Sequence, residues 1–467
     1  MEKQTQDVVL DLASNTVNVR YEDVPARVVE VTKQCILDTL GVMVAASTLG
    51  QGCREIVDLV EEGGGKGEST IFGYGIKAPC WMAAFANGAM SHSLDFDDVL
   101  DAGYVHASVS TVPPAFAIAE RVGGVTGKEF ITAVALGNDL ICRLGLSYTR
   151  RPEGFKPIWM FTPLFGVFSA TAACCRLMQM DEEKTVNALG IAMEQAGGSR
   201  VLANSTGTNL RGLYANFPAR TGVLSALMAE KGITTGKDVF EGKGGFYSNY
   251  LGGNYHRDSL TDELGRRFEG IDVSFKPWPS CRETHTYIEA TLGIVREDSI
   301  NMEDIDEIKV FIDEVAQQMC RPLEGRRKPE TSMDAKFSIP FTVAVATAHR
   351  EVSLKHFTSA GIQDRAVLQV AQKVVPQLHP NLEAVRNMPP AKVEIRTRDG
   401  KVHSHKIDIP YGHPEKPMAA EDLVKKFRDC VSYSVKPVSE GNREKAISML
   451  NKLEEIDDVS QVIQLLS

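Results

Sequence analysis

The chain has 467 residues, which is long enough for two or three domains, and its 43% hydrophobic and 24% charged residues are typical of a soluble globular protein. A net charge of −10 argues against a nucleic-acid-binding surface, and no uninterrupted apolar run approaches the roughly 20 residues that a membrane span needs. The charged N-terminus lacks the apolar core of a signal peptide, and the nine cysteines form no C-x-x-C motif. We therefore expect a cytoplasmic protein with reduced thiols, no nucleic-acid partner and no membrane contact.

The first half of the chain predicts a succession of helices. Asp23 and Pro25 are residues that favour the cap and the first turn of a helix. Thr126 and Glu129 have the spacing of a capping box, which begins another helix. Apolar spacing and similar end signals predict helices over 25–46, 81–90, 127–146, 163–178, 181–195 and 215–231.

The pattern changes in the second half. Ile308, Val310 and Ile312 alternate with polar residues, as in a half-buried strand. Two further alternating segments, 393–395 and 402–407, flank an Asp-Gly pair that is typical of a β-hairpin. Helices are expected between these strands, over 284–297, 341–350 and 367–374, and again in the tail, over 420–466.

The predicted fold is therefore mainly α with an α+β insertion. A large all-helical domain would cover 1–272 and be completed by the C-terminal helices of 409–467. A smaller α+β domain would cover 273–408. The return to helices in the tail is what makes the second domain an insertion.

A cluster of titratable residues follows the helix of 81–90. His92, Asp95, Asp97 and Asp98 lie within seven residues, and His106 comes shortly downstream. If the helix continued, residues 92, 95 and 98 would share one face because they are three apart. Acids at the end of a buried helix are unfavourable unless they are solvated, hydrogen-bonded or functional. A polar loop with its acids in water is an equally open interpretation.

Two basic stretches also stand out. Arg211 and Arg220 lie around the start of a helix, where they could bind a polyanionic substrate, although surface arginine is the simpler interpretation. Lys276 and Cys281 lie in a proline-rich turn just before another helix. A cysteine there could have a lowered pKa, unless the turn is only a stiff interdomain linker.

Other kinds of site are not supported. No pair of histidines has metal-binding spacing, and the H-E-x-x-H and G-x-S-x-G motifs are missing. Asp95, Asp97 and Asp98 could bind a hard cation, but one short run rarely supplies a full coordination shell. We therefore expect no metal site.

These stretches, in this order, resemble the MmgE/PrpD family. The resemblance covers nearly the whole chain, and the combination of motifs is specific although each motif alone is weak. It implies an all-helical domain with an inserted α+β lid, an active site in the cleft between them, a homodimer and no cofactor. The matching motifs are His92-Ser-Leu-Asp95-Phe-Asp-Asp98 with His106-Ala-Ser108, Lys276-Pro-Trp-Pro-Ser-Cys281-Arg, Ala335-Lys-Phe-Ser-Ile339 and Gly412-His-Pro-x-x-Pro417.

The resemblance implies catalytic roles for three residues. Asp95 matches the active-site acid of the family, His106 its general acid/base, and Lys276 the cleft lysine on the lid side. Family members move protons with such histidine, lysine and acid side chains, next to a carboxylate of the substrate.

Five further residues are expected to bind the substrate: Arg211, Arg220, Cys281, Met160 and His92. Arg220 matches a recurrent arginine of the family. Arg211 stands where the family commonly has a lysine, and Met160 where a histidine is common. An arginine binds carboxylate but is a poor proton shuttle, and a methionine makes one wall of the site more apolar. These departures favour a modified substrate.

The resemblance implies a cofactor-independent lyase acting on a small di- or tricarboxylate. The first hypothesis is a hydro-lyase similar to 2-methylcitrate dehydratase, which abstracts an α-proton and eliminates water. The alternatives are an epimerase or isomerase of the iminodisuccinate epimerase kind and a decarboxylase of the cis-aconitate decarboxylase kind. A non-catalytic carboxylate-binding relative is a further alternative, motivated by Arg211 and Met160.

Overall fold

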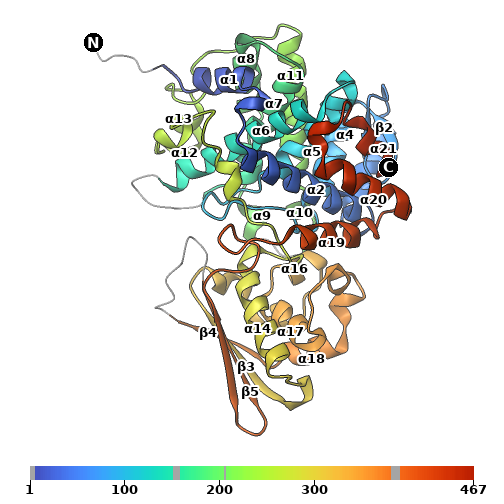
Figure 1. Cartoon of the computed structure of the whole chain (residues 1–467). Coiled ribbons are helices and arrows are strands. Elements are labelled where there is room, and N and C mark those ends of the chain that lie inside the picture. The colour runs from blue at the N-terminus through green and yellow to red at the C-terminus, as the bar shows by residue number, and fades with distance from the viewer. Residues whose placement is uncertain (1–5, 151–157, 205–206, 380–389) are drawn as a thin grey trace.

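The computed structural model describes residues 6–150, 158–204, 207–379 and 390–467. Figure 1 shows a larger helical part above a smaller part that contains a β-sheet. A short hairpin of β1 (Ser69–Ile71) and β2 (Ile76–Ala78) belongs to the helical part. Its helices before the sheet are α1 (Val9–Asn18), α2 (Ala26–Leu49), α3 (Cys53–Gly63), α4 (Cys80–His92), α5 (Ser108–Val122), α6 (Gly127–Thr149), α7 (Phe161–Leu177), α8 (Glu182–Met193), α9 (Val201–Asn204), α10 (Leu210–Leu213), α11 (Asn216–Glu230), α12 (Phe246–Leu251) and α13 (Asp258–Thr261).

Local sequence signals explain several helix ends. The hydroxyl of Thr126 accepts a hydrogen bond from the backbone N–H of Glu129, whose carboxylate accepts one from the backbone N–H of Thr126. This is the predicted capping box, and it begins α6. Asp181 caps α8 by accepting a hydrogen bond from the backbone N–H of Lys184. The helices predicted in the first half of the chain are all present, close to their predicted bounds.

Helix α6 is the one helix of the described residues that is long and apolar enough to cross a membrane. The apolar stretch that meets this test is entirely buried inside the protein. It packs between α5 and α7, where Gly137 lies against backbone of α7 that a side chain at this position would contact. This burial is typical of the central helix of a globular core.

The C-terminal helices return to the helical part. They are α19 (Ala420–Val431), α20 (Glu440–Asn451) and α21 (Ser460–Leu465), and Figure 1 shows them beside α2 and α4. Phe427 and Cys430 of α19 are buried in the same apolar core as α2, where Gly41 leaves room for the Phe427 ring. The α+β part is thus inserted between elements that share one core. The boundaries at 272/273 and 408/409 stay predictions.

The second part contains a four-stranded sheet in the order β4-β3-β5-β6. Its elements are α14 (His285–Glu297), β3 (Ile305–Ile312), α15 (Leu323–Arg327), α16 (Ser332–Lys336), α17 (Ile339–His349), α18 (Arg365–Ala371), β4 (Val374–Leu378), β5 (Ala391–Thr397) and β6 (Val402–Ile407). The predicted hairpin joins β5 and β6, with Gly400 at a φ of +86° in its turn. The prediction that helix reaches Val374 was wrong, because Val374 begins a strand that pairs in parallel with β3.

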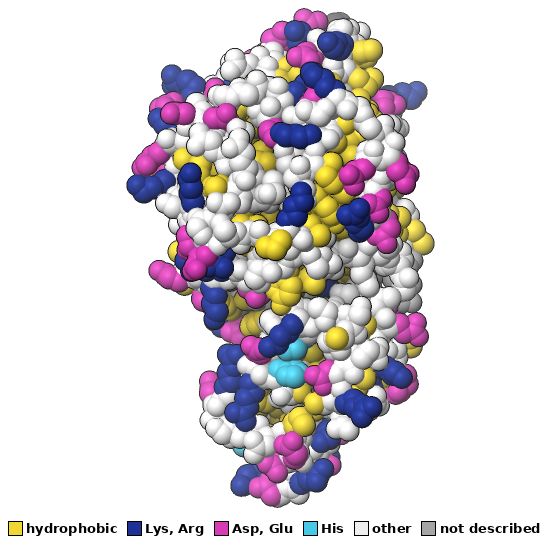
Figure 2. Space-filling view, turned by 90° about the vertical axis from the view of Figure 1, so that its right-hand side faces the viewer, with side chains coloured by type: hydrophobic (Ala, Val, Ile, Leu, Met, Phe, Trp, Pro, Cys, Tyr) yellow, Lys and Arg dark blue, Asp and Glu magenta, His cyan; other side chains and the backbone are white. Residues whose placement is uncertain are grey.

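Helices α14 and α17 pack on the sheet and bury its apolar residues (Figure 1). Along β5, buried and half-buried residues alternate, which is the period that its sequence predicts. The predicted fold class, mainly α with an α+β insertion, is confirmed. On the face shown in Figure 2, acidic and basic side chains are interspersed over both parts, and apolar side chains gather in a band over the helical part.

Candidate active site

The loop between α4 and α5 (93–107) carries the acid cluster. Helix α4 ends at His92, and Asp95 has a φ of +49°, a left-handed conformation that interrupts any continuing helix. The predicted shared helical face was therefore wrong, since only His92 is helical. Asp95, Asp97 and Asp98 are each at most 3% exposed, so the alternative with acids in water was wrong as well. Buried carboxylates need partners, and these identify the site.

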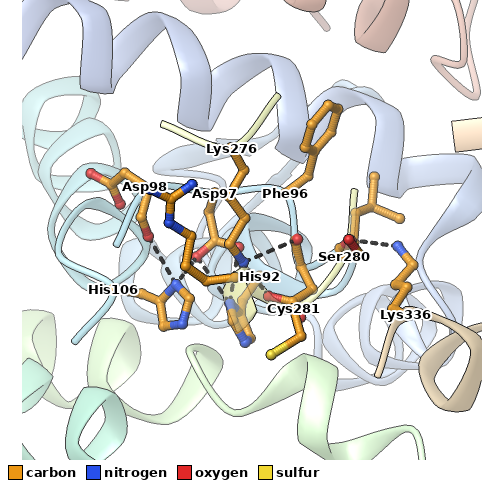
Figure 3. A network of polar contacts seen from close by, with 12 residues as sticks. His92, Phe96, Asp97, Asp98, His106, Lys276, Ser280, Cys281 and Lys336 are labelled. Carbon is orange, nitrogen blue, oxygen red and sulfur yellow. Dashed lines mark hydrogen bonds and ion pairs between the residues drawn. The ribbon is translucent and has the colours of Figure 1, made fainter. Parts of the chain in front are cut away.

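Two histidines converge on the carboxylate of Asp97 (Figure 3). The Nδ1 atom of His106 lies 2.7 Å from Asp97 Oδ2, and the Nδ1 atom of His92 lies 3.0 Å from both carboxylate oxygens. The two imidazole rings meet edge to face, with 4.7 Å between their centroids. Asp97 thus bridges two imidazoles at hydrogen-bonding distance.

The two histidines of this trio differ in the direction in which their pKa values are shifted. Burial by itself would raise the pKa of Asp97, but the two imidazoles hold it well below its ordinary value. Burial lowers the pKa of His92. Burial also acts to lower the pKa of His106, but the Asp97 carboxylate outweighs it and the net pKa is raised. Asp97 is therefore ionised at neutral pH, and His106 holds a proton more readily than His92 does.

The free end of the trio is Nε2 of His106. The backbone N–H of His106 donates to Thr162 Oγ1 at 2.9 Å, and its Nδ1 lies 2.8 Å from the Asp98 carbonyl oxygen as well as beside Asp97. Its side chain is 18% exposed, compared with 5% for His92 and 0% for Asp97. Within the described part of the chain, no residue bonds its Nε2. This atom is therefore where the trio can exchange a proton with a bound molecule.

A second charged pair, Lys276 with Asp95, lies beside the trio. Both side chains are buried, and the ammonium of Lys276 pairs with Asp95 Oδ1 and donates to the Asp95 carbonyl oxygen at 3.1 Å. Burial would raise the pKa of Asp95 and lower that of Lys276, but their attraction outweighs it, so the pKa of Asp95 falls and that of Lys276 rises. Asp95 Oδ2 is buried with no hydrogen-bond partner among the described residues. It is an open acceptor inside the site.

The carboxylate of Asp98 binds the start of α5 rather than a histidine of the trio. Its carboxylate accepts hydrogen bonds from the backbone N–H and the hydroxyl of Ser108, at 3.2 and 2.5 Å. Asn138 in turn donates to the Ser108 hydroxyl at 3.1 Å. Burial raises the pKa of Asp98, and no described contact joins its carboxylate to His106. Asp98 therefore fixes the start of α5, and with it the position of the loop.

Sequence reasoning assigned no role to Lys336, at the end of α16. Its ammonium donates to the Leu94 carbonyl oxygen, and the residue is 1% exposed (Figure 3). Burial, opposed by Asp95 and aided by Lys276, lowers the pKa of Lys336 to about 7. The available signal was a lysine directly before the apolar run 339–348, within the Ala335-Lys-Phe-Ser motif.

Tyr214 was also missed. Its ring centroid lies 4.4 Å from that of His92, and burial raises the pKa of its phenol well above the ordinary value. Met160 packs against the small apolar cluster that Tyr214 forms with Val109 and Ala215. The structure thus places Met160 against the cluster that contains Tyr214. Its part in a more apolar wall of the substrate site stays a prediction.

Arg211 lies on α10, and Cys281 lies in the turn before α14. The guanidinium of Arg211 lies 3.5 Å from the centre of the Phe337 ring and donates to the Ala203 carbonyl oxygen at 2.8 Å. The interpretation that Cys281 has a lowered pKa was wrong. Burial raises the pKa of its thiol, and the carboxylates of Glu283 and Asp95 add to this effect against Lys276 and Arg211.

Arg220 lies apart from these groups. It is on α11, its guanidinium carbon lies 5.4 Å from the centre of the Phe85 ring, and its Nε is buried with no partner among the described residues. No contact described for it reaches His106, Asp97 or Asp95. Its proposed contact with substrate stays a prediction.

The described residues that could hold a metal ion are His92, Asp97 and His106, whose ligand atoms lie within 4.8 Å of one another. Their nitrogen–oxygen distances of 2.7–3.0 Å are those of hydrogen bonds, and they account for both Nδ1 atoms and both carboxylate oxygens. The raised pKa of His106 also favours a proton on this ring rather than a metal ligand. The geometry fits a hydrogen-bonded trio, so we derive no step through a metal ion.

The fold is a helical part with an inserted α+β part, and the loop between α4 and α5 forms, together with Lys276, a buried His–Asp–Lys network that Lys336 of the α+β part contacts. These features define a protein with a candidate active site. The chain belongs to the MmgE/PrpD family: the model of the MmgE/PrpD N-terminal domain matches residues 10–258, and that of the C-terminal domain matches residues 278–452. The predicted resemblance is confirmed.

Three relatives agree with this assignment. The chain is 27% identical to human cis-aconitate decarboxylase, over 94% of this chain and 90% of the relative. It is 26% identical to the mouse cis-aconitate decarboxylase, over 93% and 88%. It is 24% identical to the cis-aconitate decarboxylase-like protein oryM of Aspergillus oryzae, over 99% and 97%. The relatives of this chain are thus enzymes of a lyase-type family.

Proposed function

We propose that this protein is a cofactor-independent lyase that eliminates water from a small di- or tricarboxylate. The observation that carries the proposal is the pairing of a proton donor with an open acceptor in one network. His106 has a raised pKa and a free Nε2, and Asp95 has an unpartnered buried oxygen beside the ammonium of Lys276. A proton donor, a proton acceptor and a cation beside the developing negative charge are the groups that such an elimination can use.

The proposed reaction assigns one task to each group. Asp95 Oδ2 takes the proton from the carbon next to the carboxylate, and the electrons of that C–H bond form the double bond. The C–O bond breaks, and the leaving hydroxyl takes a proton from Nε2 of His106 and departs as water. The buried ammonium of Lys276 stabilises the negative charge that develops on the substrate carboxylate. The protons on Asp95 and His106 then re-equilibrate with solvent.

The substrate carboxylates need positive partners as well. The guanidinium of Arg211 lies over the Phe337 ring and donates one N–H to the Ala203 carbonyl. Within the described ranges no other acceptor is bonded to it, so its further N–H donors are the groups that we propose for a substrate carboxylate. An arginine stays protonated at neutral pH, so here it binds charge and does not move protons. The Met160 and Tyr214 wall favours a substrate with an apolar group on that side.

Decarboxylation is the second candidate, because the three relatives are named as cis-aconitate decarboxylases or as similar to them. In that reaction a C–C bond breaks in place of a C–O bond, carbon dioxide leaves, and His106 donates its proton to the substrate carbon. The same network serves both reactions, since both need a proton donor and a cation beside developing negative charge.

The test is proton NMR of the purified protein in D2O with citrate, methylcitrate, cis-aconitate and iminodisuccinate, each incubated separately. The expected result is a new vinylic proton from citrate, or replacement of the methyl doublet of methylcitrate by the singlet of a methyl group on a double bond, with no loss of carbon dioxide. Carbon dioxide release with deuterium in the product would establish decarboxylation instead. Loss of the α-proton signal from an unchanged skeleton would identify an epimerase. No change in any of the four acids would contradict the proposal.

A further inference from the structure

Three consecutive backbone carbonyls of the α4–α5 loop accept hydrogen bonds from three buried lysines. Lys336 donates to the carbonyl oxygen of residue 94, Lys276 to that of residue 95, and Lys426 to that of residue 96. The three lysines are 1%, 0% and 7% exposed. They come from the end of α16, from the turn before α14, and from α19, so they are distant in the sequence. We call these three lysines the lysine clamp.

Lys426 is the member of the clamp that is bound most completely by protein groups. Its ammonium lies 2.5 Å from the Phe96 carbonyl oxygen, 3.0 Å from the Lys276 carbonyl oxygen and 2.6 Å from Asp38 Oδ1. Two of its N–H groups donate to the two carbonyl oxygens, and the Asp38 carboxylate is the ion-pair partner of the same ammonium. The same nitrogen lies 3.8 Å from the centre of the Phe96 ring. Protein groups therefore surround the Lys426 ammonium, which binds the backbone of the loop and that of the turn that carries Lys276.

Lys336 makes the matching contact at the other end of the three carbonyls. Its carbonyl oxygen also accepts a hydrogen bond from the backbone N–H of Cys281 at 3.0 Å, so the residue joins the loop to the turn that carries Lys276. Among the described residues Lys336 has no acidic ion-pair partner, and burial of such a lysine is unfavourable. The cost of its burial argues that the hydrogen bond to the Leu94 carbonyl has a role in positioning the loop.

The segment that these contacts hold is one that needs external support. Asp95 is the residue with positive φ, a conformation that non-glycine residues adopt only when their surroundings enforce it. A change of backbone angle at Asp95 would move its carboxylate relative to Lys276. It would also move Asp97, two residues on, relative to His92 and His106.

We propose that Lys336 and Lys426 are positioning residues, which hold the left-handed turn at Asp95 from two sides. Holding this turn places the Asp95 carboxylate beside Lys276. It also places the Asp97 carboxylate beside His106. The catalytic value of this placement rests on the proposed function, whereas the placement itself does not. It assigns a functional task to α19, a helix that follows the α+β part and whose side chains are otherwise core or surface. The site is complete only when both parts of the fold and the C-terminal helices are in place.

The experiment compares Lys426→Met and Lys336→Met with Lys373→Met as the matched control. Lys373 also donates to backbone carbonyls, those of Ile305 at 2.7 Å and Met302 at 3.3 Å, but within the α+β part. The first readout is the NMR titration of the His106 imidazole, identified by the signal that disappears in His106→Ala. This readout needs no substrate, so it tests the clamp even if the wild-type protein turns over none of the four acids.

In both clamp variants the pKa of His106 is expected to fall, because Asp97 moves away and burial then acts on the ring without compensation. On the acid that the wild type converts, kcat is expected to fall by roughly tenfold to a hundredfold, as for a slightly misplaced catalytic group, with KM within about threefold. Lys336→Gln keeps a donor and should recover part of both effects. Lys373→Met should change neither.

The proposal is overturned if folded clamp variants titrate His106 as the wild type does, whatever happens to their melting temperature or their kcat. It is overturned equally if Lys373→Met lowers the pKa of His106 as far as the clamp variants do. If Lys426→Met does not fold, Lys336→Met and Lys336→Gln decide by the same criterion, and Lys426→Gln replaces the unfolded variant. A wild type that converts none of the acids refutes the proposed function and leaves the titration as the test of the clamp.

Discussion

The carboxylate of Asp97 holds Nδ1 of His106 at 2.7 Å, and it does so from a position with no exposure to solvent. A buried anion on one side of an imidazole keeps a proton on the facing nitrogen and leaves the other nitrogen for exchange. The protonation of His106 is therefore governed by where the α4–α5 loop places Asp97. Substitution of either residue should therefore alter the reaction.

Replacing Asp97 with asparagine should shift the pH dependence of the reaction. Asp97 raises the pKa of His106 against the effect of burial, so its removal lets burial lower that pKa. If protonated His106 is the acid, the alkaline limb of kcat/KM against pH moves to lower pH, and the rate at pH 8 falls by about tenfold or more. Asp364→Asn is the control, since Asp364 pairs with His349 at 2.9 Å on the surface. An unshifted alkaline limb in Asp97→Asn would refute this role.

Removing the imidazole of His106 should nearly abolish turnover. His106→Ala is expected to lower kcat by roughly a hundredfold or more, the loss typical of a missing general acid. His349→Ala, a substitution of the same kind at the surface pair, should retain the wild-type rate. Circular dichroism establishes that both variants are folded. A His106→Ala rate within about threefold of the wild-type rate would exclude His106 from the chemistry.

The ion pair of Asp97 with His106 should stabilise the folded protein by an amount that depends on pH. The pKa of Asp97 is lowered on folding, so its contribution is present above the unfolded value near 4 and is lost as the pH falls. The pKa of His106 is raised, so its contribution is present below about 6.5 and is lost as the pH rises through the folded value. The stability advantage of the wild type over Asp97→Asn should therefore be largest near pH 5 to 6 and smaller on both sides. Urea unfolding at several pH values measures it, and a difference that rises steadily to pH 9 would contradict the account.

Lys276 and Asp95 should be coupled in stability. Lys276→Met leaves a buried carboxylate without its cation, which is expected to lower the free energy of unfolding by about 3–5 kcal/mol. Adding Asp95→Leu to this variant removes the unpaired charge and should restore part of the loss, so that the two single effects do not add. Urea unfolding of the two single variants and the double variant measures the coupling. Additive losses would show that the two groups do not depend on each other.

The sequence predicted much of the fold, because its helices carry their own end signals. The capping box of Thr126 and the aspartate cap of α8 are local, and so is the hairpin turn before β6. Strand β4 was missed because a parallel edge strand depends on a partner far away in the sequence, here β3, where Ile308 pairs with Val374, rather than on its own pattern. The homodimer, the cytoplasmic location and the lack of a cofactor stay predictions.

The candidate site was predicted in part for the same reason. His92, Asp95 and His106 lie in one short stretch and Lys276 in a proline-rich turn, so the sequence singled out these stretches, and the resemblance to the family supplied the roles. The left-handed turn at Asp95, the placement of Tyr214 against His92 and the approach of Lys336 and Lys426 depend on tertiary packing. A lysine in an apolar stretch is visible in the sequence, but the carbonyl that it binds is not.

The most direct test of the account is to incubate the wild type and His106→Ala side by side in D2O with the panel of four acids and to follow both by proton NMR. The account predicts that the wild type converts one hydroxy acid, citrate or methylcitrate, to the product with a carbon–carbon double bond and that the variant does so at least about a hundredfold more slowly. Equal rates in the two proteins, or no conversion by the wild type of any acid in the panel, would contradict it.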